Sequence, residues 1–308
     1  MVTLPSSVTA FHTHLTVPVA GGPLTVAVAG PAEPGAAVVL GAHGITGSHC
    51  SLEALARHLT AHEITFLAPD LRGRGGSSGL PGPYGLDVHV ADLVAALDYW
   101  GTERAVLVGH SMGAYVVARL AAAHPDRCAG VALVDGGLSP PVPTHLDADA
   151  VLEAVLGPAL ARLRMEFASP EDYRDFWRGH PAFAGRWNAD VERYVDYDLG
   201  GPPGALRSRV VENAVRTDGR SILDSAAAWA ALIAAPGPVT LIRAPRGLAD
   251  EDHPLIPAAV VDQARRAVPG MAHLLVRDTN HYLIVLGDRE AATVAAELAR
   301  VVASGGAG

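Results

Sequence analysis

The sequence places a serine, a histidine and two candidate aspartates where they could together carry out nucleophilic catalysis. The serine is Ser111, at the centre of the pentapeptide Gly109-His110-Ser111-Met112-Gly113. An apolar run precedes this pentapeptide and a helical pattern follows it, which predicts a sharp strand-to-helix turn with the serine at its apex. A serine at the start of a helix can attack an acyl carbon, because backbone N–H groups there stabilise the developing anion.

The predicted general base is His281. The chain contains 14 histidines, so a single histidine carries little information by its type alone. His281 lies in Asn280-His281-Tyr282, after the last apolar run and before the last helical pattern, where a loop can bring an imidazole to the serine hydroxyl. His273 belongs instead to the preceding strand or its start.

The carboxylate that would fix the tautomer of this imidazole has two candidates. Asp135 directly follows the apolar run 131–134, and Gly136 and Gly137 after it allow a tight turn. Asp250 follows a later apolar run, 239–242, but lies eight residues beyond Ile242. We favour Asp135 and keep Asp250 as the alternative acid.

The elements that must position these residues are short apolar runs that alternate with helical patterns. This alternation predicts a mostly parallel sheet with helices on both faces, whose strand ends carry the site. An N-terminal hairpin turning at Gly21-Gly22 is expected over residues 9–30. The other expected strands are 37–40, 64–68, 105–108, 131–134, 239–242 and 274–276, and the clearest helices are 88–100, 114–123 and 289–302.

These motifs resemble the α/β-hydrolase superfamily. Besides the serine pentapeptide, the resemblance includes His43-Gly44, the segment Asp-Leu-Arg-Gly-Arg-Gly at 70–75, and Asn280-His281-Tyr282. The order nucleophile, acid, histidine is also that of the superfamily. The resemblance implies the α/β-hydrolase fold and a serine hydrolase, because the related haloalkane dehalogenases and epoxide hydrolases have an aspartate in place of Ser111.

Two N–H groups are needed to bind the oxyanion. One is expected from Met112, the residue after the nucleophile. By similarity to the superfamily, the other comes from Ile45, with Gly44 as the second choice. His43 is expected to structure this loop rather than to act in catalysis.

Residues 138–230 break the alternation and predict an inserted helical cap between two core segments, 1–137 and 231–308. The cap shows no clear strand and opens with the proline-rich stretch 139–143. Eight of the 16 aromatic residues fall between 167 and 197. They either form the core of the cap or line an apolar pocket over the serine. The residues predicted to contact substrate are Trp187, Phe183 and Tyr194.

Composition excludes several other functions. The chain has no lysine, so Schiff-base chemistry is excluded, and its net charge of −9 without a basic patch argues against nucleic acid as a partner. No apolar run reaches the ~18 residues that span a bilayer. The N-terminal stretch lacks the pattern of a signal peptide, so a cytoplasmic protein without a membrane partner is expected. No metal motif is found, and the proposed chemistry requires no cofactor.

The expected function is hydrolysis of a carboxylic ester or lactone with a sizeable apolar group, through an acyl-enzyme on Ser111. The architecture is similar to that of superfamily lactonases, including those that open zearalenone. Carbon–carbon or amide hydrolysis or cofactor-free peroxidation with the same residues is an alternative, and so is a ligand sensor with little turnover. The oligomeric state is left open, with a homodimer as one option.

Overall fold

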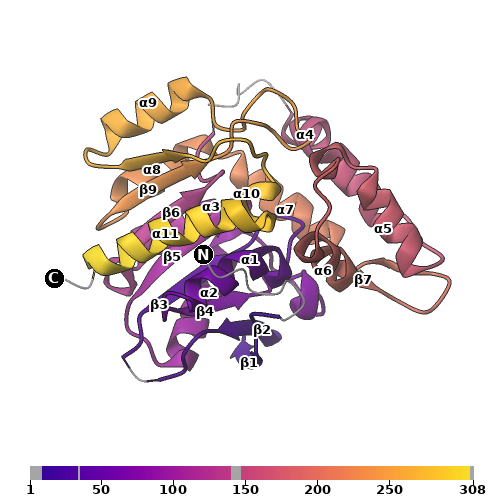
Figure 1. Cartoon of the computed structure of the whole chain (residues 1–308), viewed down its shortest axis with the longest axis horizontal. Coiled ribbons are helices and arrows are strands. Elements are labelled where there is room, and N and C mark those ends of the chain that lie inside the picture. The colour runs from indigo at the N-terminus through magenta and orange to yellow at the C-terminus, as the bar shows by residue number, and fades with distance from the viewer. Residues whose placement is uncertain (1–8, 34, 140–146, 306–308) are drawn as a thin grey trace.

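The computed structural model describes residues 9–33, 35–139 and 147–305. Its centre is an eight-stranded sheet with the order β1-β2-β4-β3-β5-β6-β9-β10 (Figure 1). The hairpin β1–β2 is antiparallel, β2 pairs antiparallel with β4, and the remaining pairs are parallel. The strands are β1 (Thr13–Val19), β2 (Gly22–Ala29), β3 (Val38–Ala42), β4 (Thr65–Pro69), β5 (Ala105–His110), β6 (Cys128–Val134), β9 (Val239–Arg243) and β10 (Ala272–Leu275).

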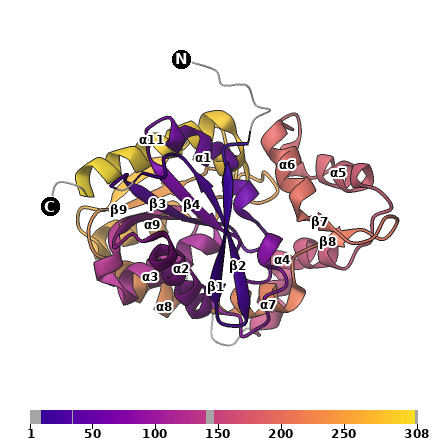
Figure 2. The same ribbon diagram turned by 90° about the horizontal axis from the view of Figure 1, so that it is seen from below.

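Helices cover both faces of this sheet, as Figure 2 shows. One face carries α1 (Glu53–Thr60), α10 (Leu283–Leu286) and α11 (Asp288–Gly305). The other carries α2 (Leu86–Trp100), α3 (Met112–Ala123), α8 (Ser225–Ala234) and α9 (Ala258–Ala267). Strands β3, β4, β5 and β6 consist almost entirely of buried residues, as strands covered on both faces must. The sheet separates two apolar clusters, one under each helical layer. The predicted α/β-hydrolase fold is confirmed.

The chain between β6 and β9 is mostly helical. It forms α4 (Ala148–Leu163), α5 (Pro170–Arg178), α6 (Ala189–Asp198), the antiparallel pair β7 (Leu199–Gly200) and β8 (Arg207–Ser208), α7 (Glu212–Ile222) and then α8. In both views α4 to α7 lie beside the sheet rather than on one of its faces. No helix of the described ranges is both long and apolar enough to cross a membrane.

Two details differ from the sequence analysis. The expectation of no strand between 138 and 230 missed β7 and β8, because strands of two residues leave no alternating pattern. The boundary at 230/231 falls inside α8, which packs on α3 in the core. Residues 140–143 of the proline-rich stretch lie outside the described residues. That the remainder is a separate cap unit stays a prediction.

Candidate active site

Ser111 occupies the turn between β5 and α3. Its backbone has φ 55° and ψ −120°, a conformation that residues other than glycine rarely adopt. Such a backbone costs about 1–3 kcal/mol and persists only where its surroundings enforce it. Two glycines make this possible by close approach. A Cβ on Gly113 would lie 2.0 Å from the carbonyl oxygen of Ala42, and one on Gly109 would lie 2.1 Å from that of Gly113. The pentapeptide therefore has glycines where no side chain fits.

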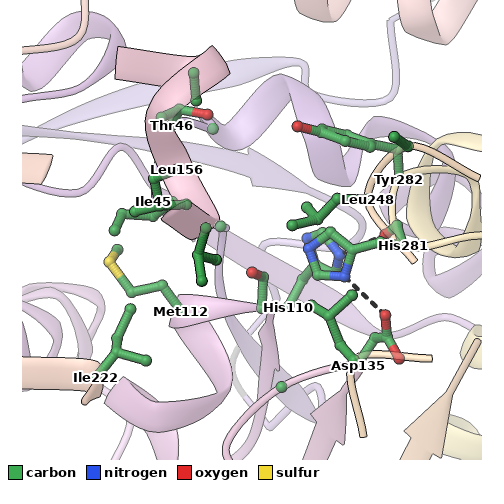
Figure 3. A pocket seen from close by; sticks show the side chains of 18 of the residues that line it. Ile45, Thr46, His110, Met112, Asp135, Leu156, Ile222, Leu248, His281 and Tyr282 are labelled. Atoms are coloured by element: carbon green, nitrogen blue, oxygen red, sulfur yellow. Dashed lines mark hydrogen bonds and ion pairs between the residues drawn. The ribbon is translucent and has the colours of Figure 1, made fainter. Parts of the chain in front are cut away.

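His281 is held by Asp135. Its Nδ1–H donates to Asp135 Oδ2 over 2.7 Å, and both side chains are buried (Figure 3). The other carboxylate oxygen accepts the N–H of Ala244 over 3.0 Å. Asp135 itself lies at the end of β6 with φ 46°. With Nδ1 engaged, Nε2 is the nitrogen of His281 that remains to accept a proton.

Asp250, the alternative acid, does not contact His281. Its carboxylate accepts from Arg246 Nε over 2.9 Å and from Asn280 Nδ2 over 3.1 Å. The loop after β9 turns this side chain toward Arg246, and 39% of its surface is exposed. The structure thus brings Asp135, and not Asp250, to the imidazole.

His110 is a second imidazole in the site that the sequence analysis did not single out. Its Nε2–H donates to the carbonyl oxygen of His281 over 2.9 Å, and the two rings lie 4.7 Å apart. Burial, together with the nearby His281, lowers the pKa of His110 well below its usual range, so the ring is neutral. His110 therefore fixes the backbone of His281 without adding charge.

The loop after β3, where the second oxyanion donor is expected, lies beside Ser111. Gly44 lies against Ser111, since a Cβ there would be 3.4 Å from Ser111 Cβ. The loop turns back through a hydrogen bond from Gly47 N–H to the Gly44 carbonyl, 2.9 Å long. In the described part of the chain, no acceptor for the N–H groups of Ile45 and Met112 is found. Both are therefore free to bind an oxyanion.

His43 holds this loop in place. Its Nε2 accepts the N–H of Leu71 over 2.9 Å, so Nδ1 carries the proton and donates to the Gly44 carbonyl over 2.8 Å. Complete burial lowers the pKa of His43 to about 4. A neutral imidazole with both nitrogens engaged in the backbone is suited to structure, not to proton transfer.

Arg74 and Asp218 connect the same loop to α7. Arg74 Nε donates to the carbonyl oxygen of Ile45 over 2.9 Å, and its Nη1 donates to Asp218 Oδ2 over 2.5 Å. Asp218 also accepts from the backbone N–H of Gly85 and pairs with His89. All three side chains, Arg74, Asp218 and His89, are fully buried. Sequence reasoning missed Asp218, because its partner is 144 positions away.

Ser111 and His281 both line one cavity of about 1010 Å³. In Figure 3, His281 and Tyr282 lie on one side, and Ile45, Met112, Leu156 and Ile222 on the other. Most of the wall is apolar. Helix α4 contributes Val151, Leu152, Ala154, Val155, Leu156, Pro158 and Ala159 to it. In the described ranges, no group of three or more His, Cys, Asp or Glu side chains could hold a metal ion.

Of the three aromatic residues predicted to contact substrate, only Tyr194 lines this cavity. Phe183 is buried behind the wall, where its ring packs against Trp177 and Tyr282. Trp187 donates to Glu192 and lies under Arg178, away from the cavity. Phe183 and Trp187 therefore belong to the aromatic packing of the helical segment, and Trp177 and Phe176 take the expected places in the wall.

Beside the site, His49 forms a buried ion pair with Asp70 at the end of β4. His49 Nδ1 lies 3.0 Å from Asp70 Oδ1, and Tyr197 of α6 donates to the other oxygen over 2.7 Å. Burial alone would lower the pKa of His49, but the carboxylate outweighs burial and raises it to about 10, while the pKa of Asp70 falls to about 2 despite its own burial. This pair joins α6 to the core.

Replacement of His49 by glutamine is expected to show the pH dependence of this pair. Because the folded pKa of about 10 exceeds the ordinary 6.5, the stabilisation is complete below about pH 6.5 and is lost as the pH rises through 10. Urea unfolding should give a deficit of about 3 kcal/mol for His49→Gln at pH 6 that shrinks by pH 10. The exposed His62→Gln variant is the control, and a deficit independent of pH would contradict the ion pair.

Parts of the chain are similar in sequence to known hydrolases. The chain is 40% identical over 126 residues to lipase LipV of Mycobacterium tuberculosis, covering 41% of this chain and 44% of that protein. It is 46% identical over 102 residues to epoxide hydrolase A of the same organism, covering 32% of each. The matches thus span less than half the length of these relatives.

A solved structure, E-2-(acetamidomethylene)succinate hydrolase, superposes with a TM-score of 0.75 at 21% identity, covering 93% of this chain and 98% of that one. At this identity the likeness concerns the fold alone. The model of the protein family described as "alpha/beta hydrolase fold" matches residues 37–288 of this chain. The chain therefore belongs to the α/β-hydrolase family.

Proposed function

We propose that this protein is a cofactor-independent serine hydrolase that cleaves a carboxylic ester or lactone bearing a sizeable apolar group. The observation that carries the proposal is the convergence of the strained Ser111 and the Asp135-bound His281 on one cavity. The serine at the strand-to-helix turn favours acyl transfer over epoxide opening, although an epoxide hydrolase is among the relatives. The predominantly apolar wall favours an apolar substrate.

The proposed reaction proceeds in two acyl-transfer steps. Ser111 Oγ attacks the acyl carbon while His281 Nε2 takes its proton, and the Asp135 carboxylate stabilises the resulting imidazolium. The N–H groups of Met112 and Ile45 hold the oxyanion, with Gly44 as the alternative donor. His281 then protonates the leaving oxygen. A water molecule, deprotonated by the same imidazole, releases the acid and restores the serine.

Turnover of p-nitrophenyl esters tests this proposal directly. A burst of p-nitrophenol equal to the enzyme concentration, followed by a slower steady state, is the kinetic sign of an acyl-enzyme. Steady multiple turnover would exclude the ligand sensor. Activity on 1,3-diketones without activity on esters would instead support carbon–carbon hydrolysis. The cytoplasmic location, the oligomeric state and the absence of membrane or nucleic-acid partners stay predictions.

Labelling with a fluorophosphonate tests the pairing of nucleophile and base. The reagent is expected to modify Ser111, as peptide mass spectrometry would show, and the labelling rate should fall by about 100-fold or more in His281→Ala, because general-base catalysis contributes that much. His273→Ala is the matched control, since His273 lies in β10 and pairs with Arg243 outside the cavity wall. Full-rate labelling of His281→Ala would remove this imidazole from the mechanism.

A further inference from the structure

Arg162, on the last turn of α4, is a buried cation in the wall of the active-site cavity. Its Nη1 donates to Asp198 Oδ2 over 2.6 Å and to the hydroxyl oxygen of Tyr173. Its Nη2 is also buried but has no hydrogen-bond partner among the described residues. Nη1 of the guanidinium is therefore hydrogen-bonded within the protein, whereas Nη2 is not.

An unpaired donor of this kind is costly. A buried polar atom without a partner loses its hydration and gains nothing in return, and the loss is larger for a charged group. Burial disfavours the charge on Arg162, but the Asp198 carboxylate outweighs it, and the pKa of Arg162 lies above its ordinary value. The guanidinium is thus permanently charged, and Nη2 keeps two N–H donors for an acceptor.

The surroundings of Arg162 orient it rigidly. Its guanidinium carbon lies 4.9 Å from the centre of the Trp177 ring, a cation–π contact that fixes the plane of the donors. Trp177, His180 and Tyr194 line the same cavity as Arg162 and Ser111. A substrate held at Ser111 therefore shares its cavity with the ordered side chain of Arg162, which comes from α4.

Charge balance decides what kind of acceptor fits. Asp198 already neutralises Arg162, and its second oxygen accepts from Ser208 Oγ over 2.8 Å. The cavity wall also holds the Asp135 carboxylate and Glu251. A further carboxylate from a ligand would leave uncompensated negative charge in a buried place, whereas a carbonyl oxygen would satisfy Nη2 without adding charge.

We propose that Arg162 Nη2 binds a second, uncharged oxygen acceptor of the substrate, such as a ketone, amide or ester carbonyl remote from the scissile one. The inference rests on the proposed acyl transfer at Ser111 and adds a substrate class to it. The substrates are then apolar esters or lactones with one further carbonyl group. Arg162 is the specificity residue that selects them.

Matched pairs of substrates test this inference. Each p-nitrophenyl ester of an oxoalkanoic acid, with the ketone two to seven carbons from the ester, is paired with the alkanoate of equal length. For at least one ketone position, kcat/KM is expected to exceed that of the alkyl partner by about tenfold, the gain expected from a hydrogen bond to a charged donor. The half-ester of the dicarboxylic acid of equal length should gain nothing.

The variants separate recognition from folding. Arg162→Met should reduce the ketone preference to about one, and Arg162→Met combined with Asp198→Asn should do the same without leaving a buried carboxylate unpaired. Arg164→Met is the control, because it makes the same chemical change beside the same helix at an exposed residue that pairs with Glu212. This variant should keep the preference for the ketone ester. Preference retained in both Arg162 variants would place the donor elsewhere and overturn the inference.

Binding to Ser111→Ala distinguishes this inference from the proposed reaction. Calorimetric dissociation constants for the same ketone and alkyl esters require no turnover. A wild-type enzyme without esterase activity would therefore contradict the proposed reaction, while recognition of the ketone by Arg162 could still be tested by binding. Tighter binding of the ketone ester, lost in Ser111→Ala combined with Arg162→Met, supports the inference. Equal binding at every chain length, or stronger binding of the carboxylate half-ester, overturns it.

Discussion

Replacing Ser111 by alanine is expected to lower kcat for ester hydrolysis by about six orders of magnitude, as loss of a serine nucleophile does in a serine protease. The loss is large because the substitution removes the attacking oxygen itself, and without it no acyl-enzyme can form. Binding of substrate should change little, since the apolar wall of the cavity is untouched. Stopped-flow kinetics should show that the burst of p-nitrophenol disappears together with turnover.

A second substitution at the same position separates chemistry from strain. Ser111→Gly also removes the nucleophile, but glycine adopts φ 55° without the clash of a Cβ. Its free energy of unfolding should therefore exceed that of Ser111→Ala by about 1 kcal/mol. The control is Ser221→Ala on α7, whose hydroxyl donates to the backbone of Thr217. Residual turnover of a few per cent in Ser111→Ala would contradict the assignment of the nucleophile.

The core of the fold and the turn at Ser111 could be predicted because their signals are local. Buried parallel strands require short continuous apolar runs, and each of the six runs predicted as strands overlaps a strand of the sheet. The turn at Ser111 requires glycines on both sides, so five consecutive residues contain the whole signal. Asp135 could be favoured, but not established, because a sequence does not show which way the loop carrying Asp250 turns.

The remainder of the site depends on contacts between distant residues. Arg162 and Asp198 are 36 positions apart, and Arg74 and Asp218 are 144 apart, so no local pattern links the partners. The aromatic residues of the helical segment were predicted as a group, yet their directions depend on packing. Phe183 turns into the cluster around Trp177, whereas Trp177 itself reaches the cavity. Composition predicted an apolar wall and gave no sign of the buried cation in it.

Replacing Asp135 by asparagine is expected to lower kcat by up to about 10⁴-fold, the effect of the corresponding change in a serine protease. The substitution preserves shape, so the fold should be retained. The carbonyl oxygen of the introduced amide can still accept the N–H of Ala244, which directs its NH₂ group toward His281. That group then donates to Nδ1, where the carboxylate had accepted.

This reversal explains why so small a change should have so large an effect. An imidazole that accepts at Nδ1 carries its proton on Nε2, and in that tautomer it cannot take the proton of Ser111. Thermal unfolding should therefore change little while turnover collapses. Asp250→Asn is the matched control, because Asp250 contacts Arg246 and Asn280 but not the imidazole. If Asp250→Asn abolished turnover and Asp135→Asn did not, the contact of 2.7 Å between Asp135 and His281 would be structural and the acid would have to reach the imidazole by movement of the loop after β9.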